Sequence, residues 1–307
     1  VAMSAQLAEP FTAERVALRT PPLVALPLSV ALAVLFVVSL HLWRIVGYED
    51  KDRNEAGTIK RRFCSTLLSC ALSGAAVCAL ATPVASGSGG LTYAELLGFQ
   101  MHSAPRACLA SLALTAALFL GPLAQHALAF CSGYAPVLRL PEDRLMALRD
   151  LALAPCTEEF VFRACLVRLW DSAGFPEALV LLGGPLCFAL AHAHHFVEHV
   201  RRLDDKRAAL AQVGFQVAYT SVFGMYATAL LLRTGSTLAV MLVHSFCNHQ
   251  GFPDLSVFAE EDHPLLGHRR LLVVCYLFGM VAFGCLFAPL TAGFDPLFQC
   301  VGRGSPG

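Results

Sequence analysis

The sequence predicts an all-α protein, a polytopic membrane helix bundle with about eight transmembrane helices. Of the 307 residues, 56% are of hydrophobic types and 14% are charged, whereas about a quarter of the residues in a soluble domain are charged. Much of the apolar sequence lies in stretches close to the roughly 20 residues that a helix needs to cross about 30 Å of hydrocarbon. A water-soluble globule of this length could not bury so much apolar surface.

Eight apolar stretches are candidate spans, and more polar segments separate them. They lie near residues 23–43, 63–83, 107–130, 151–170, 178–198, 210–232, 236–251 and 271–292. The first stretch begins after Pro21 and Pro22, and it is too long and too far along the chain for a cleavable signal. No internal repeat or second domain is visible in the sequence. We therefore expect a single integral-membrane domain over residues 1–307, with its core at about 107–292.

Charge and cysteine content argue against several classes of function. The formal net charge is zero, so no overall basic character indicates a nucleic-acid partner. The 12 cysteines are scattered through apolar stretches without a CxxC pair, which favours small packing residues over disulfides or a metal site. We therefore expect the protein to contact the lipid bilayer and not to bind nucleic acid.

The distribution of lysine and arginine predicts the orientation, because these residues are retained on the cytoplasmic side of a membrane. Eight spans would place four connections on one side, and these connections hold 15 basic residues. They are residues 44–62, 131–150, 199–209 and 252–270. The opposite segments hold four basic residues, namely Arg15, Arg19, Arg233 and Arg303. These segments are the N-terminal tail, residues 84–105, 171–177 and 233–235, and the C-terminal tail. Both termini are therefore expected on the lumenal or extracytoplasmic side.

The fourth stretch carries three ionisable residues, Glu158, Glu159 and Arg163. An ionisable group inside the hydrocarbon costs roughly 2.5–3.5 kcal/mol on insertion scales, so it faces the bundle interior or has a function. Glu159 and Arg163 are four residues apart, in the favourable order for an ion pair. Glu158 lies about 100° further round the helix and has no such partner. A structural role inside the bundle remains open for both glutamates. Pro155 predicts that this helix begins or bends nearby.

Two further stretches bring polar groups to the same depth. Phe188 and His192 lie near the cytosolic end of the fifth, and His244 and Asn248 lie in the cytosolic half of the seventh. Both His244 and Asn248 can donate hydrogen bonds from one helical face, as an oxyanion hole requires. Taken alone, His192 would also fit a helix interface, and the second pair would also fit a helix cap.

Together the three groups are sufficient for peptide hydrolysis without a metal. A carboxylate and a histidine can hold and deprotonate a water molecule, and a second histidine with an asparagine can stabilise the tetrahedral oxyanion. No serine or cysteine nucleophile is needed, although Ser245 and Cys247 lie close by on other sides of the helix. We therefore expect neither a cofactor nor a metal at this site.

At these residues the sequence resembles the type II CAAX prenyl endopeptidases, the Ras-converting enzymes within the wider ABI membrane-protease family. The family pattern is EExxxR, FxxxH and HxxxN, each on its own helix. Here it reads Glu158-Glu159 with Arg163, Phe188 with His192, and His244 with Asn248. The neighbouring stretches IKRRF (59–63), LFLGPL (118–123), TEEFVFRAC (157–165), AHAHHFVEHVR (191–201) and HSFCNHQGFP (244–253) resemble the eukaryotic enzymes in particular. Each motif is short, but all three in register are highly specific.

The resemblance implies a multi-pass enzyme of the endoplasmic-reticulum membrane with its active site facing the cytosol. It would remove the last three residues of farnesylated or geranylgeranylated CaaX proteins, such as small GTPases, after the lipid-bearing cysteine. Carried over by position, Glu158 would activate the water with help from His192. His244 and Asn248 would stabilise the oxyanion. The supporting residues would be Glu159, Arg163 and Phe188.

Three alternatives stay open at the level of sequence. His195, Glu198 and His199 spell the H-x-x-E-H pattern of some zinc proteases, and Glu260 or Glu261 would be a third ligand. A transporter, or a scaffold that binds prenylated proteins without cutting them, would also place polar groups inside the membrane. A protease of the same family acting on other membrane peptides is the third. Chelator-sensitive activity restored by zinc would identify the first.

Overall fold

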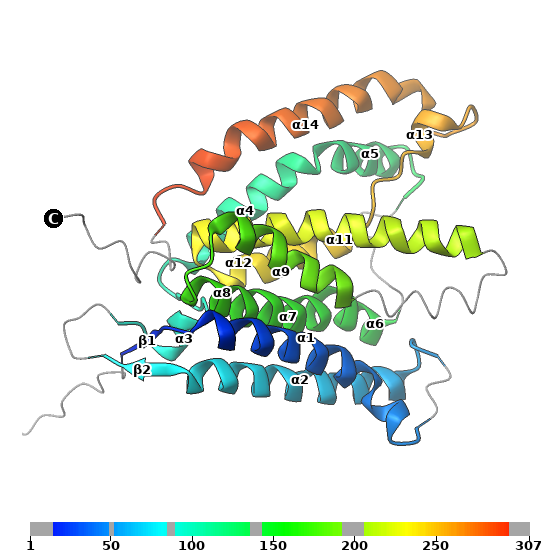
Figure 1. Cartoon of the computed structure of the whole chain (residues 1–307). Coiled ribbons are helices and arrows are strands. Elements are labelled where there is room, and N and C mark those ends of the chain that lie inside the picture. The colour runs from blue at the N-terminus through cyan, green and yellow to red at the C-terminus, as the bar shows by residue number, and fades with distance from the viewer. Residues whose placement is uncertain (1–14, 49–51, 85–89, 136–142, 192–205, 295–307) are drawn as a thin grey trace, which may run out of the picture.

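The computed structural model describes residues 15–48, 52–84, 90–135, 143–191 and 206–294, which form a bundle of long helices with one small sheet at its end (Figure 1). This architecture confirms the all-α class. The segments η1 and η2 are π-helical and η3 is a 3-10 turn. The elements in chain order are β1 (Val16–Leu18), α1 (Pro22–Ile45), α2 (Ala56–Ala79), β2 (Ala81–Pro83), α3 (Tyr93–Leu96), α4 (Ala104–Leu118), α5 (Leu120–Cys131), α6 (Arg144–Leu148), η1 (Arg149–Leu153), α7 (Ala154–Glu159), η2 (Phe160–Val167), α8 (Arg168–Ser172), α9 (Glu177–Ala191), α11 (Lys206–Thr234), α12 (Thr237–Gln250), α13 (Ser256–Ala259), η3 (Leu266–His268) and α14 (Arg269–Leu290).

Four of the described helices are long and apolar enough to cross a membrane, which supports a multi-pass membrane protein. They are α1, α2, the part of α11 over Leu210–Thr234, and Leu266–Leu290, which joins η3 to α14. The pair α4 and α5 would add a fifth span, although it is bent by 74°. The stretches predicted at 151–170, 178–198 and 236–251 are helical in their described parts, but their helices are shorter or more polar. The count of eight therefore stays a prediction.

The predicted span at 107–130 is broken in the structure, and Pro122 explains where. Proline has no N–H to donate to the carbonyl of Leu118, and its ring clashes with that carbonyl in a regular helix. Helix α4 accordingly ends at Leu118, and α5 begins two residues later. Helix α14 packs closely against the bend at Gly121. A Cβ atom at this position would overlap the Tyr276 ring of α14. Small residues are what allow such close approach between membrane helices.

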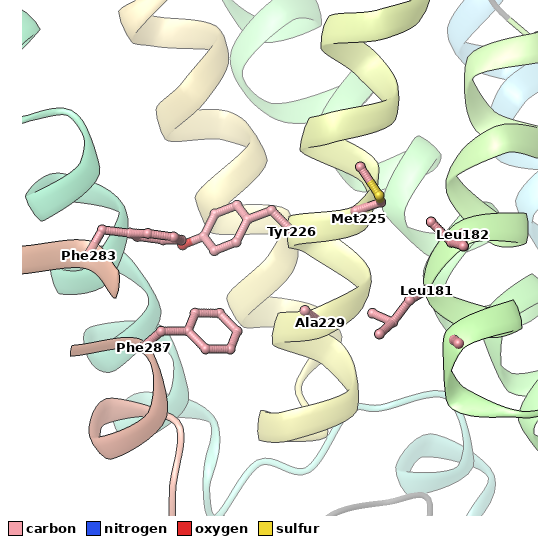
Figure 2. A pocket seen from close by; sticks show the side chains of 8 residues that line it. Leu181, Leu182, Met225, Tyr226, Ala229, Phe283 and Phe287 are labelled. Carbon is pink, nitrogen blue, oxygen red and sulfur yellow. The ribbon is translucent and has the colours of Figure 1, made fainter. Parts of the chain in front are cut away.

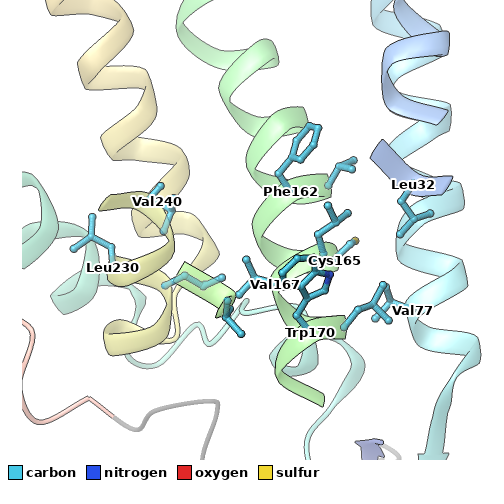
Figure 3. Close-up of a cluster of buried hydrophobic side chains, with 14 of the residues drawn as sticks. Leu32, Val77, Phe162, Cys165, Val167, Trp170, Leu230 and Val240 are labelled. Atoms are coloured by element: carbon cyan, nitrogen blue, oxygen red, sulfur yellow. The ribbon is translucent and has the colours of Figure 1, made fainter. Parts of the chain in front are cut away.

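The helix that carries the acidic motif lies in the centre of the bundle. Every residue from Val161 to Trp170 is buried, and this segment contacts α1, α2, α9, α11 and α12. Figure 3 shows Phe162 in this cluster, with Leu32 of α1 on one side and Val240 of α12 on the other. A helix that is buried on every side belongs in an interior. Arg163 and Arg168 are therefore enclosed by other helices.

The two ends of the bundle are different. At one end β1 pairs with β2. Thr92 caps the start of α3 at this end, because its hydroxyl accepts a hydrogen bond from the Glu95 backbone N–H. A hydrogen bond from the Thr92 backbone holds the pKa of Glu95 below its ordinary value. At the opposite end Arg149 donates hydrogen bonds to the carbonyl oxygen of Arg53 and to Oδ1 of Asn54. The connection between α1 and α2 thus meets the start of η1, away from the sheet (Figure 1).

Candidate active site

The acidic motif lies on an irregular helix. The backbone stays helical over Arg144–Ser172, but it passes through the π-helical segments η1 and η2 on either side of α7. Glu158 and Glu159 are the last two residues of α7, and Arg163 lies in η2. The sequence predicts a start or a bend near Pro155. The helix does not start there, because it continues from η1 through Pro155 into α7; a bend there stays a prediction. π-Helical turns are rare, and they occur frequently at functional sites.

Glu159 is completely buried and connects two helices. Its Oε1 accepts a hydrogen bond from Nη1 of Arg163 at 3.1 Å, with exposed side-chain fractions of 0% and 1%. This is the ion pair predicted from the four-residue spacing. The same oxygen lies 2.6 Å from Nδ1 of His244 on α12. Its other oxygen has no hydrogen-bond partner among the described residues. Since a buried charge is stable only when it is paired, Glu159 and Arg163 depend on each other.

His244 lies between the two glutamates. Its Nδ1 contacts Glu159, and its Nε2 is 3.8 Å from Oε2 of Glu158. When Nδ1 carries the proton that Glu159 accepts, Nε2 faces Glu158 as an acceptor in the neutral ring or as a donor in the imidazolium. A separation of 3.8 Å is too long for a direct hydrogen bond, and a water molecule commonly bridges such a gap. The polar atoms of Glu158 and His244 therefore lie side by side.

Asn248 lies one helical turn beyond His244, and it is exposed. Its Nδ2 donates a hydrogen bond of 2.9 Å to the backbone carbonyl of Asp150 in η1. An amide nitrogen carries two hydrogens, so one of them remains for a substrate oxygen. The structure thus brings Glu158, Glu159, Arg163 and His244 together, with Asn248 at the rim.

The remaining predicted site residues are Phe188 and His192, at the end of α9 and directly after it in the sequence. Phe188 lies in the last turn of α9, but its side chain is outside the described part of the structure, and His192 lies outside the described residues. The H-x-x-E-H residues His195, Glu198 and His199 also fall outside them. Within the described ranges, no group of three His, Cys, Asp or Glu side chains is placed to hold a metal ion.

Helix α11 closes the site from a third direction through Phe223, which the sequence did not indicate. The Phe223 ring centroid is 4.6 Å from that of His244 and 5.8 Å from the guanidinium carbon of Arg163. At the next residue, Gly224, a Cβ atom would lie 3.1 Å from Nη2 of Arg163 and 2.8 Å from Pro185. An aromatic residue in an apolar span carries no chemical signal. The glycine, as a marker of close helix approach, was the one available hint.

Comparison with known proteins places the chain in a family. The family model for type II CAAX prenyl endopeptidases, described as Rce1-like, matches residues 141–249. The human protein named CAAX prenyl protease 2 is 36% identical over 273 residues, which cover 85% of this chain and 79% of that protein. The fission yeast protein named probable CAAX prenyl protease 2 is 30% identical, over 74% of this chain and 81% of its own length. No solved structure shows a significant match. The chain belongs to the type II CAAX prenyl endopeptidase family.

Proposed function

We propose that this chain removes the C-terminal aaX tripeptide from prenylated CaaX proteins by hydrolysis, with Glu158 and His244 at the reacting bond. One observation carries the proposal: His244 is held between two glutamates of a neighbouring helix, in a chain whose relatives are named CAAX prenyl protease 2. A carboxylate and an imidazole side by side can provide the proton transfers of peptide hydrolysis.

In the proposed mechanism Glu158 takes a proton from the attacking water, and His192 helps to hold that water. Attack on the scissile carbonyl creates a tetrahedral oxyanion, which accepts hydrogen bonds from Nε2–H of His244 and the second amide hydrogen of Asn248. Because Glu159 accepts from Nδ1, this role requires the imidazolium form of His244. The intermediate then breaks its C–N bond, and Glu158 returns the proton to the leaving amine.

The other residues of the motif would support this centre. Arg163 would balance the charge of Glu159, so that Glu159 can fix the His244 ring through Nδ1. Phe188 would pack beside the site. These residues would lie in one integral-membrane protease domain over 1–307 with an ABI-type core at about 107–292, and the matched region 141–249 falls inside that core.

The site would face the cytosol from the endoplasmic-reticulum membrane. The connection between α1 and α2 carries six basic residues over 44–62, and Arg149 contacts it at the start of the acidic helix. Since positively charged connections stay on the cytoplasmic side, this contact supports a cytosolic location for the end of the bundle where η1 begins. A CaaX peptide could then enter from water while its lipid stays in the bilayer.

Farnesylated or geranylgeranylated proteins such as small GTPases would be the substrates, and an apolar cavity supports the lipid part. The cavity is a pocket that is largely open at the surface, with a volume of about 530 Å³, within the roughly 300–1,000 Å³ typical of ligand sites. Ala229 lies six residues after Phe223 on α11. It is therefore about 9 Å along that helix from the residue that contacts His244. Among the described lining residues, Tyr226 alone carries a hydroxyl, and this hydroxyl is hydrogen bonded to Thr115. The cavity is lined by Ala178, Leu181, Leu182, Met225, Tyr226, Ala229, Phe283 and Phe287 (Figure 2).

Filling this cavity should change the preference for prenyl length. Lipid tails are as apolar as the cavity wall, so moving a prenyl group from the bilayer into the cavity contributes little to the affinity for substrate. The cavity would instead discriminate between prenyl groups of different length. We expect Ala229→Phe to lower kcat/KM for a geranylgeranylated peptide about tenfold more than for a farnesylated one. The matched control is Val281→Phe, at a position of α14 that is 63% exposed. An unchanged ratio in Ala229→Phe, or the same change in Val281→Phe, would argue against a prenyl site here.

The activity and its sidedness can be tested in one assay. Sealed endoplasmic-reticulum vesicles with their cytosolic face outward would receive a farnesylated CaaX peptide, and released aaX tripeptide would be measured. We expect release without detergent, and none from the same peptide lacking the farnesyl group. Equal cleavage of the unprenylated peptide would refute the substrate class. Activity that appears only after detergent opens the vesicles would refute the cytosolic orientation.

A further inference from the structure

The backbone of the acidic helix has a hydrogen-bonding gap one turn before the two glutamates. In η1 the N–H of Ala154 bonds to the carbonyl of Arg149, five residues back. The next residue, Pro155, has no N–H. It therefore cannot donate a hydrogen bond to the carbonyl of Asp150, five residues back, or to that of Leu151, four residues back. A carbonyl left without a hydrogen-bond donor is unfavourable, so these two carbonyls favour donors from outside the helix.

Two side chains of α12 provide those donors. Asn248 donates to the carbonyl of Asp150, and the hydroxyl of Ser245 donates to the carbonyl of Leu151. Ser245 directly follows His244 and is three residues before Asn248. Both contacts therefore join the segment that carries His244 to the helix that carries Glu158 and Glu159. They fix how far α12 is shifted and rotated relative to that helix.

We propose that Ser245 is a positioning residue for hydrolysis, which substitutes for the missing N–H of Pro155 and so holds His244 in register with Glu158 and Glu159. The assignment rests on the proposed function of those residues. Ser245 itself touches neither the glutamates nor the reacting atoms in this role. A displacement of about 1 Å at a catalytic group can cost up to 100-fold in rate, so the loss should appear in kcat rather than in binding.

The test is a set of variants assayed for tripeptide release from a farnesylated peptide. Ser245→Ala should lower kcat about 10- to 100-fold with KM nearly unchanged, and Ser245→Thr should retain most of the activity because it keeps the hydroxyl. The decisive variant is Ser245→Ala with Pro155→Ala. The alanine at 155 returns a backbone N–H that can reach the carbonyl of Leu151, so the double variant should recover most of the lost kcat. Packing alone would not produce such a rescue.

A matched control is Ser73→Ala, since Ser73 is fully buried and its hydroxyl bonds within its own helix to Ser69. Its kcat should stay near that of the unaltered chain. The proposal is overturned if Ser245→Ala keeps full kcat, or if adding Pro155→Ala does not restore it. Failure of the proposed function gives a different result, because Glu158→Ala would then still cleave the peptide.

Discussion

Replacing Glu158 with alanine is expected to reduce tripeptide release from a farnesylated CaaX peptide by about 100- to 10,000-fold, the range typical of a lost general base. Its carboxylate faces Nε2 of His244, and its side chain is 19% exposed. The buried ion pair to Arg163 is made by Glu159 instead. The variant should therefore fold and melt close to the unaltered chain, so that the loss is confined to kcat. Turnover and thermal unfolding in detergent would be measured on the same preparation.

Glu55→Ala is the matched control, because Glu55 is an exposed glutamate in the connection between α1 and α2. Its activity should be unchanged. The unaltered chain should also keep its activity in the presence of a chelator. Full turnover by Glu158→Ala would remove Glu158 from the mechanism. Activity lost to the chelator and restored by zinc would instead favour the H-x-x-E-H alternative at His195 and His199.

The parts of the site that could be predicted from the sequence are those fixed by local geometry. Glu159 and Arg163 pair because residues four apart meet on one helical face. This pairing follows from helix geometry alone and does not depend on tertiary contacts. The sequence predicted that His244 and the two glutamates lie at the same depth in the membrane. The sequence did not indicate that one nitrogen of the ring would contact Glu159 and the other would face Glu158.

Features that depend on packing between distant segments were not predictable. The contact of Asn248 with the carbonyl of Asp150 arises from a π-helical segment whose hydrogen bonds Pro155 interrupts, and sequence periodicity does not reveal π-helical turns. Phe223 contacts His244 only because α11 lies against α12. The number of spans is difficult to predict for a related reason. Helices that enclose polar groups need not be long and apolar, so hydropathy separates them poorly from other buried helices.

Glu159→Ala should behave differently from Glu158→Ala, because it removes structure as well as activity. Arg163 is 1% exposed and would keep a buried positive charge without its carboxylate partner. Breaking a buried ion pair from one side costs roughly 3–5 kcal/mol. His244 would also lose the acceptor that orients Nδ1. We expect low yield, a clearly reduced melting temperature and no measurable tripeptide release.

A double variant separates these two effects of Glu159. Replacing a buried pair with apolar residues is often neutral or stabilising, so Glu159→Ala with Arg163→Met should regain much of the lost stability. It should remain inactive, since the acceptor for His244 is still absent. The neighbouring carboxylates would thus be distinguished by stability: Glu158→Ala folded and inactive, Glu159→Ala unstable and inactive, the double variant stable and inactive. A normal melting temperature for Glu159→Ala alone would contradict the buried ion pair, and recovered turnover in the double variant would show that His244 does not depend on Glu159.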